Sequence, residues 1–215
     1  MSNSLSRGVI VGTLAMAAIV VASNILVQFL FGNWLTWGAF TYPLAFLVTA
    51  VARALRRYPL MNASIDMETE TIVVHERVNI GVAVATDQGL VVPVVTDADQ
   101  RDLLDLASEV GRLSLAARDR SISAGELRGG TATVTNYGSL GGRLATPIIR
   151  APEVAIVGFG SIRQRPLVVD GEVVARPTLP IATGADHRLI DGDVLTAFQE
   201  HVAALITDPV ALMVS

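Results

Sequence analysis

The sequence contains no cysteine, and this absence excludes disulfide bonds, thiolate metal sites and a cysteine nucleophile. Aromatic residues make up only 5% of the chain, and there are only three histidines. The net charge of -4 and the pI near 5.3 argue against a nucleic-acid-binding surface. No spacing of histidine, aspartate and glutamate suggests a metal site. A chain of 215 residues and 22.7 kDa suits one domain plus an appendage.

Charge is almost missing from the N-terminal part, where Arg7 is the only charged side chain before Ala52. Residues 8–31 are almost wholly apolar, and a transmembrane helix needs about 20 such residues. Trp34 and Trp37 then begin an aromatic-rich band of the kind found at membrane interfaces. We therefore predict a transmembrane helix. The alternatives are a signal peptide, whose apolar core is usually shorter, and a buried helix, which has few polar residues to end it here.

The segment Val21 to Thr49 resembles the first part of the bacterial queuosine precursor transporters, a family with several membrane spans. It covers less than a quarter of the chain, and one or two helices cannot form a transport pathway. We therefore divide the chain into a hydrophobic segment, 1–43, and a second domain, 44–215. With a single span, three arginines after the apolar segment outnumber Arg7, so the positive-inside rule places the second domain in the cytoplasm. Those arginines are Arg53, Arg56 and Arg57.

Strands and helices alternate after the hydrophobic segment. Helical spacing of apolar residues predicts three helices, and Pro59 is expected to end the first. Runs rich in β-branched residues predict strands, and Asp170-Gly171 predicts a hairpin turn. Pro93 indicates an edge strand or a bulge, and Ser123 with Glu126 forms a capping box. The predicted helices are 44–55, 102–117 and 191–206. The predicted strands are 71–75, 78–86, 90–96, 131–136, 153–158, 167–169, 172–175 and 178–183. The fold class is α+β, or two-layer α/β, with a mixed sheet.

The stretch Ala185 to Gly192, ADHRLIDG, combines a histidine, an arginine and a carboxylate. A base that works near neutral pH is most readily a histidine, because its unperturbed pKa is about 6.5. Asp191, four residues after His187, can orient the ring or hold the neighbouring Arg188. The alternative is a capped turn whose charges pair with one another. His75 is expected in a structural or surface role, and His201 on a solvated helix face.

Five blocks in the same order resemble one family, the catalytic domain of the dihydrolipoamide acyltransferases of 2-oxoacid dehydrogenase complexes. The blocks are ALRRYPLMNAS (54–64), VNIGVAVATDQGLVVPVV (78–95), LRGGTATVTNYGSLGG (127–142), PIIRAPEVAIVGFGSI (147–162) and ADHRLIDGD (185–193). The resemblance implies a mixed sheet with helices like that of chloramphenicol acetyltransferase. It runs from about residue 44 to the C-terminus. The family's domain normally begins several dozen residues further upstream, so we expect an N-terminally truncated version.

The family resemblance implies acyl transfer between the thiol of a dihydrolipoamide arm and coenzyme A. His187 matches the general base, and Asp191 the carboxylate that keeps the site ordered through an arginine. Thr135 matches the hydroxyl that stabilises the oxyanion, while Asn136 and Gly138 shape the turn after it. Direct transfer between thiols needs a base and an oxyanion donor but no enzyme nucleophile. From the residues alone, Thr135 could simply fill a strand position, and Asn136 and Gly138 could be ordinary turn residues.

The family also implies partners. The histidine of one subunit meets the hydroxyl of its neighbour, so we expect a homotrimer, which can assemble into a larger cage, together with decarboxylase and dihydrolipoamide dehydrogenase subunits. Coenzyme A is a substrate, the lipoyl group comes from another domain or chain, and no metal is expected. The context of residues 138–149 and of Gly184-Ala185 favours branched-chain or generic bacterial members. The alternatives are an inactive or membrane-tethered fragment that only trimerises, and an antibiotic acetyltransferase, which the NIGVAV block matches less well.

Overall fold

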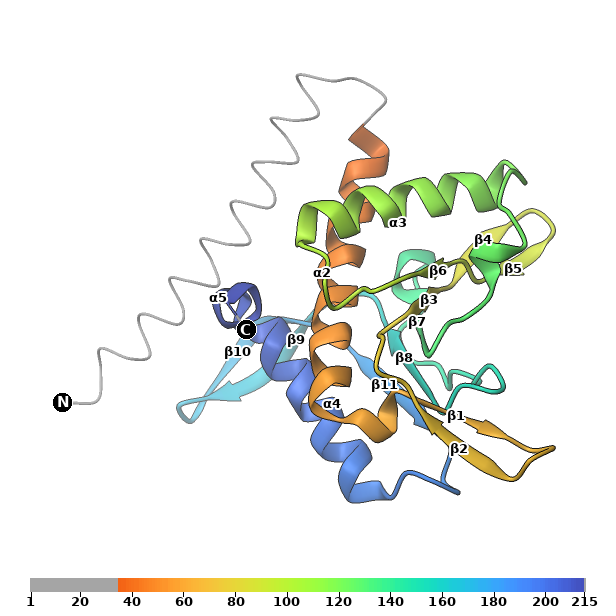
Figure 1. Ribbon diagram of the computed structural model, residues 1–215. Helices are drawn as coiled ribbons and strands as arrows, with labels where there is room; N and C mark the ends of the chain where they lie inside the picture. The colour runs from red at the N-terminus through yellow and green to blue at the C-terminus, as the bar shows by residue number, and fades with distance from the viewer. Residues whose placement is uncertain (1–34, 215) are drawn as a thin grey trace.

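The computed structural model describes residues 35–214, with side chains from 41 to 213, and they form a mixed α+β fold (Figure 1). The helices are α2 (Leu35–Arg57), α3 (Leu103–Arg118), α4 (Gly192–Thr207) and α5 (Pro209–Val214), with 3-10 turns η2 (Pro59–Met61), η3 (Gly125–Leu127) and η4 (Tyr137–Leu140). The strands are β1 (Ala63–Asp66), β2 (Thr71–Val74), β3 (Ile80–Val82), β4 (Val84–Thr86), β5 (Gly89–Val91), β6 (Val94–Val95), β7 (Ala132–Asn136), β8 (Ala155–Phe159), β9 (Arg163–Val169), β10 (Glu172–Thr178) and β11 (Ile181–Ala185). The predicted α+β class is confirmed.

The transmembrane helix predicted over residues 8–31 lies outside the described part of the chain. Within residues 35–214, no helix combines the length and apolar content needed to cross a membrane. The described part of the transporter-like segment, 35–49, belongs to helix α2. This helix is a central element of the domain, because it packs against both α3 and α4.

Helix α2 is buried on nearly every side from Leu44 onward, as expected for a helix in the middle of a core. It is longer than predicted at both ends, and Pro43 lies inside it. The helix ends at Arg57, and Pro59 opens the next turn, which confirms the predicted stop. Two basic residues near the end of α2 contact Asp99. Arg53 donates to the carbonyl oxygen of Asp99 at 3.1 Å, and Arg56 lies 3.6 Å from the carboxylate of Asp99.

The main sheet has the strand order β11-β8-β7-β3-β6, with the inner strands β8, β7 and β3 parallel and both edge strands antiparallel to them. The strand predicted over 78–86 divides into β3 and β4. The strand predicted over 90–96 divides into β5 and β6 around Pro93, whose carbonyl accepts the N–H of Val82. Since β6 is an edge strand, the prediction from Pro93 holds. Among the strands and α-helices of residues 35–214, the four-residue strand β1 and the short helix α5 were not predicted.

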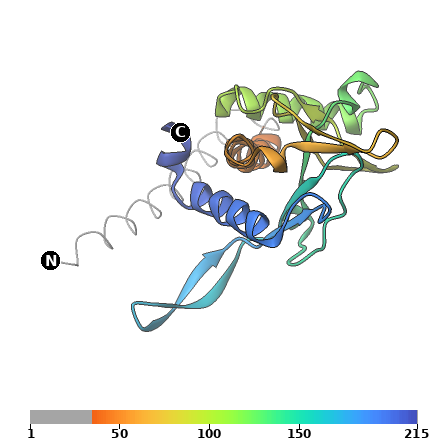
Figure 2. The same cartoon turned by 60° about the horizontal axis from the view of Figure 1, so that its bottom comes forward.

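Strands β9 and β10 form a hairpin that projects from the rest of the domain (Figure 2). The predicted turn is confirmed, since Asp170 and Gly171 have φ of 53° and 85°. The hairpin is longer than predicted because it continues the β8–β11 pair: Phe159 pairs with Ile181, and Arg163 then pairs with Thr178. A two-stranded ribbon therefore leaves the sheet at the end where β8 finishes.

Candidate active site

The loop between β11 and α4 holds the histidine motif and lies at the bottom of Figure 1. The N–H of Asp186 bonds to the carbonyl of Val154, which extends the pairing of β11 with the β8 segment by one residue. The chain then turns, because the N–H groups of Leu189 and Ile190 both bond to the carbonyl of Asp186. Ile190 is buried and anchors the loop. The turn leaves His187 at its outer side.

His187 and Asp191 are both open to solvent, with side chains 80% and 84% exposed. Nδ1 of His187 lies 3.9 Å from Oδ1 of Asp191, which is beyond hydrogen-bond range. Asp191 occupies the N-cap position of α4 without using its side chain as a cap. Its carboxylate is therefore not engaged by the helix terminus and lies close to the imidazole.

Arg188 binds Asp186 rather than Asp191. Its Nε donates to Oδ1 of Asp186 at 2.9 Å and its Nη2 to Oδ2 at 2.6 Å. The backbone N–H of Arg188 also bonds to Oδ1, so the local turn brings this carboxylate nearest. These hydrogen bonds hold the pKa of Asp186 below its ordinary value. The expected link from Asp191 to an arginine is not formed among residues 41–213. Arg188 also contacts the sulfur of Met67 in the β1–β2 turn.

Thr135 lies at the opposite end of the sheet, next to the last residue of β7, and is half-buried. Asn136 caps the following turn η4, where its side-chain oxygen accepts the N–H of Ser139 at 3.3 Å. A Cβ atom on Gly138 would lie 2.3 Å from the carbonyl carbon of Gly160, so no other residue fits there without backbone movement. Asn136 and Gly138 therefore shape the tight turn that directly follows Thr135.

The strand register separates Thr135 from His187 within one chain. Thr135 pairs with Gly158 of β8, which pairs with Ala182 of β11. Asp186 lies four residues after Ala182, just past the end of β11, which is about 13 Å at the rise of a strand. It is also two strands away from β7, the strand of Thr135. The backbones of Thr135 and Asp186 are therefore roughly 16 Å apart. One copy of the chain does not bring the predicted base and the predicted hydroxyl together.

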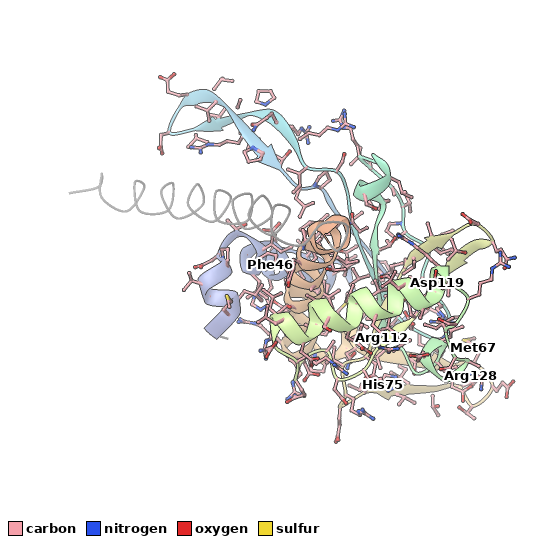
Figure 3. All side chains as sticks on the ribbon, turned by 90° about the horizontal axis from the view of Figure 1, so that it is seen from above. Phe46, Met67, His75, Arg112, Asp119 and Arg128 are labelled. Carbon is pink, nitrogen blue, oxygen red and sulfur yellow. The ribbon has the colours of Figure 1, made fainter. Side chains whose placement is uncertain are left out.

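The other two histidines lie away from this loop. His75 is half-buried, and its Nε2 is 3.0 Å from Oγ of Ser64 on the wall of a cavity of about 590 Å³. Burial lowers the pKa of His75. His201 is half-buried rather than solvated, with its ring 5.9 Å from that of Tyr58, and burial lowers its pKa. Figure 3 labels His75, whose cavity lies beside β1 and β2.

A buried carboxylate in that cavity wall was not predicted. Glu153 is 3% exposed at its side chain, and its Oε2 accepts a hydrogen bond of 2.5 Å from Oγ1 of Thr133. Burial raises the pKa of Glu153. The sequence makes Glu153 the first residue of a predicted strand, with no residue spacing that reveals its partner. Within residues 41–213, no group of three or more histidine, aspartate and glutamate side chains is arranged to hold a metal ion.

Comparison with known proteins gives one consistent result. The family model described as 2-oxoacid dehydrogenases acyltransferase (catalytic domain) matches residues 40–214. A dihydrolipoyllysine-residue acetyltransferase component of the pyruvate dehydrogenase complex from Staphylococcus aureus (strain Mu50 / ATCC 700699) is 42% identical over 170 residues, which are 79% of this chain and 40% of that protein.

Two solved structures are also similar. The cubic core of a pyruvate dehydrogenase multienzyme complex superposes with a TM-score of 0.80 at 32% identity, over 93% of this chain and 79% of that one. The dihydrolipoamide acetyltransferase (E2p) of Azotobacter vinelandii gives a TM-score of 0.80 at 31% identity, with the same coverage of each chain.

Proposed function

The chain belongs to the family of 2-oxoacid dehydrogenase acyltransferase catalytic domains, and on this basis we propose that it transfers an acyl group between a dihydrolipoamide thiol and coenzyme A. It spans about two fifths of the length of the curated relatives it matches. We propose that the lipoyl group is supplied by another domain or chain. The proposal rests on the exposed His187–Asp191 pair on the loop between β11 and α4. The family model matches residues 40–214, which include this loop.

The proposed reaction uses the residues of the site as follows. His187 takes the proton of the attacking thiol, and the sulfur adds to the thioester carbonyl. The hydroxyl of Thr135 donates to the oxyanion of the tetrahedral intermediate. The intermediate expels the second thiolate, which receives the proton from His187. Asp191 lies beside the imidazole and can help to orient the ring. No enzyme nucleophile is required, which is compatible with a chain that has no cysteine.

We propose that the complete site forms between two copies of the chain, in a homotrimer. The separation of Thr135 from His187 supports this arrangement, since each copy then contributes one of the two groups. An exposed apolar surface follows Thr135, with Leu140, Leu144 and Ile148 at 78%, 83% and 87% exposure. Apolar surface of this kind commonly marks a contact with another protein. Similarity to a cubic core supports assembly of the trimers into a larger cage.

Membership of this acyltransferase family also suggests which proteins the chain works with. The Staphylococcus relative is a component of a pyruvate dehydrogenase complex, so we propose that this chain works with 2-oxoacid decarboxylase and dihydrolipoamide dehydrogenase subunits. Because that relative is an acetyltransferase component, acetyl is the first acyl group to test. The sequence context of residues 138–149 makes branched-chain acyl groups the second.

The test is acyl transfer from acyl-CoA to dihydrolipoamide by wild type and His187→Ala. Loss of a general base should lower kcat by about 10² to 10⁴. His201→Gln is the matched control, because it removes an imidazole that packs on Tyr58, away from the loop. Wild-type turnover that does not depend on His187, or no turnover by a correctly assembled oligomer, would contradict the proposal. The second result would favour a scaffold without catalysis.

A further inference from the structure

Tyr137, the first residue of the turn η4, packs on the same face of the sheet as the side chain of Thr135. Thr135 of β7 and Gly158 of β8 are register partners on neighbouring parallel strands, so they share one face about 4.8 Å apart. A Cβ atom on Gly158 would lie 2.8 Å from Cε1 of Tyr137. The aromatic ring therefore covers the position directly beside Thr135, on the strand that lies next to β7 in Figure 1.

The ring of Tyr137 is held by packing. Its opposite edge reaches Gly142, because Cδ2 of the ring lies 3.0 Å from the position of a Cβ atom there. Pro147 packs against the same glycine as the ring, with Cγ 2.8 Å from the Cβ position on Gly158. The hydroxyl of Tyr137 is buried and has no hydrogen-bond partner among residues 41–213. Since a buried hydroxyl without a partner costs stability, what Tyr137 contributes here is the volume of its ring.

A second side chain covers this face on the other side of β7. Gly81 of β3 is the register partner of Thr133, two residues before Thr135. A Cβ atom on Gly81 would lie 2.8 Å from Cγ1 of Val92. Thr135 therefore lies on a strip of β7 with Val92 over the strand on one side and the larger Tyr137 over the strand on the other.

An acyl group bound at Thr135 has to fit beside this ring. When the Thr135 hydroxyl donates to a thioester oxygen, that oxygen lies about 2.8 Å away and the carbonyl carbon about 1.2 Å further. The next carbon of the acyl chain is then within about 5 Å of the hydroxyl, which is also the distance to the neighbouring strand that Tyr137 covers. Acetyl ends at this carbon, whereas isobutyryl carries two more carbon atoms on it.

We propose that Tyr137 sets the size limit for the acyl group and restricts the chain to short groups such as acetyl. This inference rests on the proposed function, since it places the reacting thioester at Thr135. The two extra carbons of a branched chain meet the ring, and the ring cannot withdraw because Gly142 and Gly158 lie against both of its edges. A single methylene group in a pocket of fixed size changes kcat/KM by about 10- to 200-fold, so one rigid ring is enough to select acetyl.

The test measures transfer of acetyl, propionyl and isobutyryl from their coenzyme A thioesters by wild type, Tyr137→Leu and Tyr137→Phe. Wild type should lose at least about tenfold in kcat/KM from acetyl to isobutyryl, and Tyr137→Leu should raise the isobutyryl-to-acetyl ratio about tenfold. Tyr137→Phe keeps the ring, so it should keep the wild-type ratio and melt no lower than wild type. Tyr42→Leu makes the same change at an exposed position of α2 and should leave the ratio unchanged.

Binding provides a second measurement that needs no turnover. S-ethyl-coenzyme A and S-isobutyl-coenzyme A are unreactive thioethers with the carbon skeletons of the acetyl and isobutyryl thioesters. In calorimetry, wild type should bind S-ethyl-coenzyme A about tenfold more tightly than S-isobutyl-coenzyme A. Tyr137→Leu should bind the two thioethers nearly equally.

The outcomes separate this inference from the proposed function. Equal use of acetyl and isobutyryl by wild type overturns the size limit, even if Tyr137→Leu does not fold. A relaxed ratio in Tyr137→Phe also overturns it, because the hydroxyl and not the ring would then set the preference. Equal affinity of wild type for the two thioethers, or no binding of either, overturns it as well. A preference for S-ethyl-coenzyme A that Tyr137→Leu loses, without any acyl transfer by wild type, supports the size limit and removes the proposed reaction.

Discussion

Arg188 holds Asp186 through two parallel hydrogen bonds, with Nε–Oδ1 at 2.9 Å and Nη2–Oδ2 at 2.6 Å. His187 lies between these two residues in the chain. The pair therefore fixes the backbone on both sides of the proposed base, although neither side chain needs to touch the substrate. Charge-assisted, two-point pairs of this kind are geometrically specific.

Asp186→Asn should lower kcat by about 10- to 100-fold and change KM little, because a loosened His187 misses its working position. Steady-state kinetics on the assembled protein measures this. Asp193→Asn, on the first turn of α4, is the control, since Asp193 bonds only to a neighbouring backbone N–H. A variant with normal kcat would show that the pair does not position His187.

Replacing Gly138 by a larger residue should disturb the turn after Thr135 by steric overlap. Gly138→Ala places a methyl group against the backbone of Gly160 and should destabilise the fold by about 1–3 kcal/mol or more. Gly192→Ala is a matched control, because its added Cβ meets nothing within 4 Å and it lies at the start of α4. Thermal unfolding should separate the two. Equal melting temperatures would show that the turn adapts.

Local sequence signals predicted the start of helix α3 and the capping box well. Helix α3 begins after Asp102, whose side chain accepts the N–H of Asp105, and its buried residues follow the predicted apolar spacing. The capping box is present too, because Glu126 accepts the N–H of Ser123 and donates its own N–H to Oγ of Ser123. Such features depend on residues three or four apart, and the sequence shows them directly.

Relationships between distant segments could not be predicted in the same way. Even nearby partners can depend on the fold, because the choice of Asp186 over Asp191 as partner of Arg188 is decided by how the loop turns. The distance from Thr135 to His187 depends on strand order and register, which connect residues far apart in the chain. Strand β1 has four residues, too few for a periodic signal, and it forms because β2 and Glu153 lie beside it.

The buried carboxyl of Glu153 should make the stability of the folded protein depend on pH. Burial raises the pKa of Glu153 above its ordinary value of 4.5, so the folded protein keeps a proton that the unfolded chain releases. Stability therefore falls as the pH rises from 4.5 through the raised pKa of the folded state. Glu153→Gln retains an acceptor for Thr133 without this titration. It should raise the melting temperature by about 2–4 °C at pH 7 and by little at pH 4.

Melting curves of wild type and Glu153→Gln at pH 4 and pH 7 check this difference in melting temperature. Thr133→Val is the companion variant, because it removes the hydroxyl that donates to Glu153 while leaving the carboxylate in place. It should be less stable than wild type, most of all at pH 7, where the buried carboxylate would be left with Arg150 alone at 3.9 Å. A gain from Glu153→Gln that is the same at pH 4 and pH 7 would contradict a titrating Glu153.

A shared site predicts complementation between two inactive variants. His187→Ala retains Thr135, and Thr135→Val retains His187, so neither homo-oligomer has a complete site. When the two are unfolded together and reassembled in equal amounts, about a quarter of the interfaces should combine an intact histidine with an intact threonine. Activity should recover to about a quarter of the wild-type value, and mixing without reassembly should recover none. If reassembled mixtures stay inactive although each variant forms the normal oligomer, Thr135 and His187 do not act across an interface.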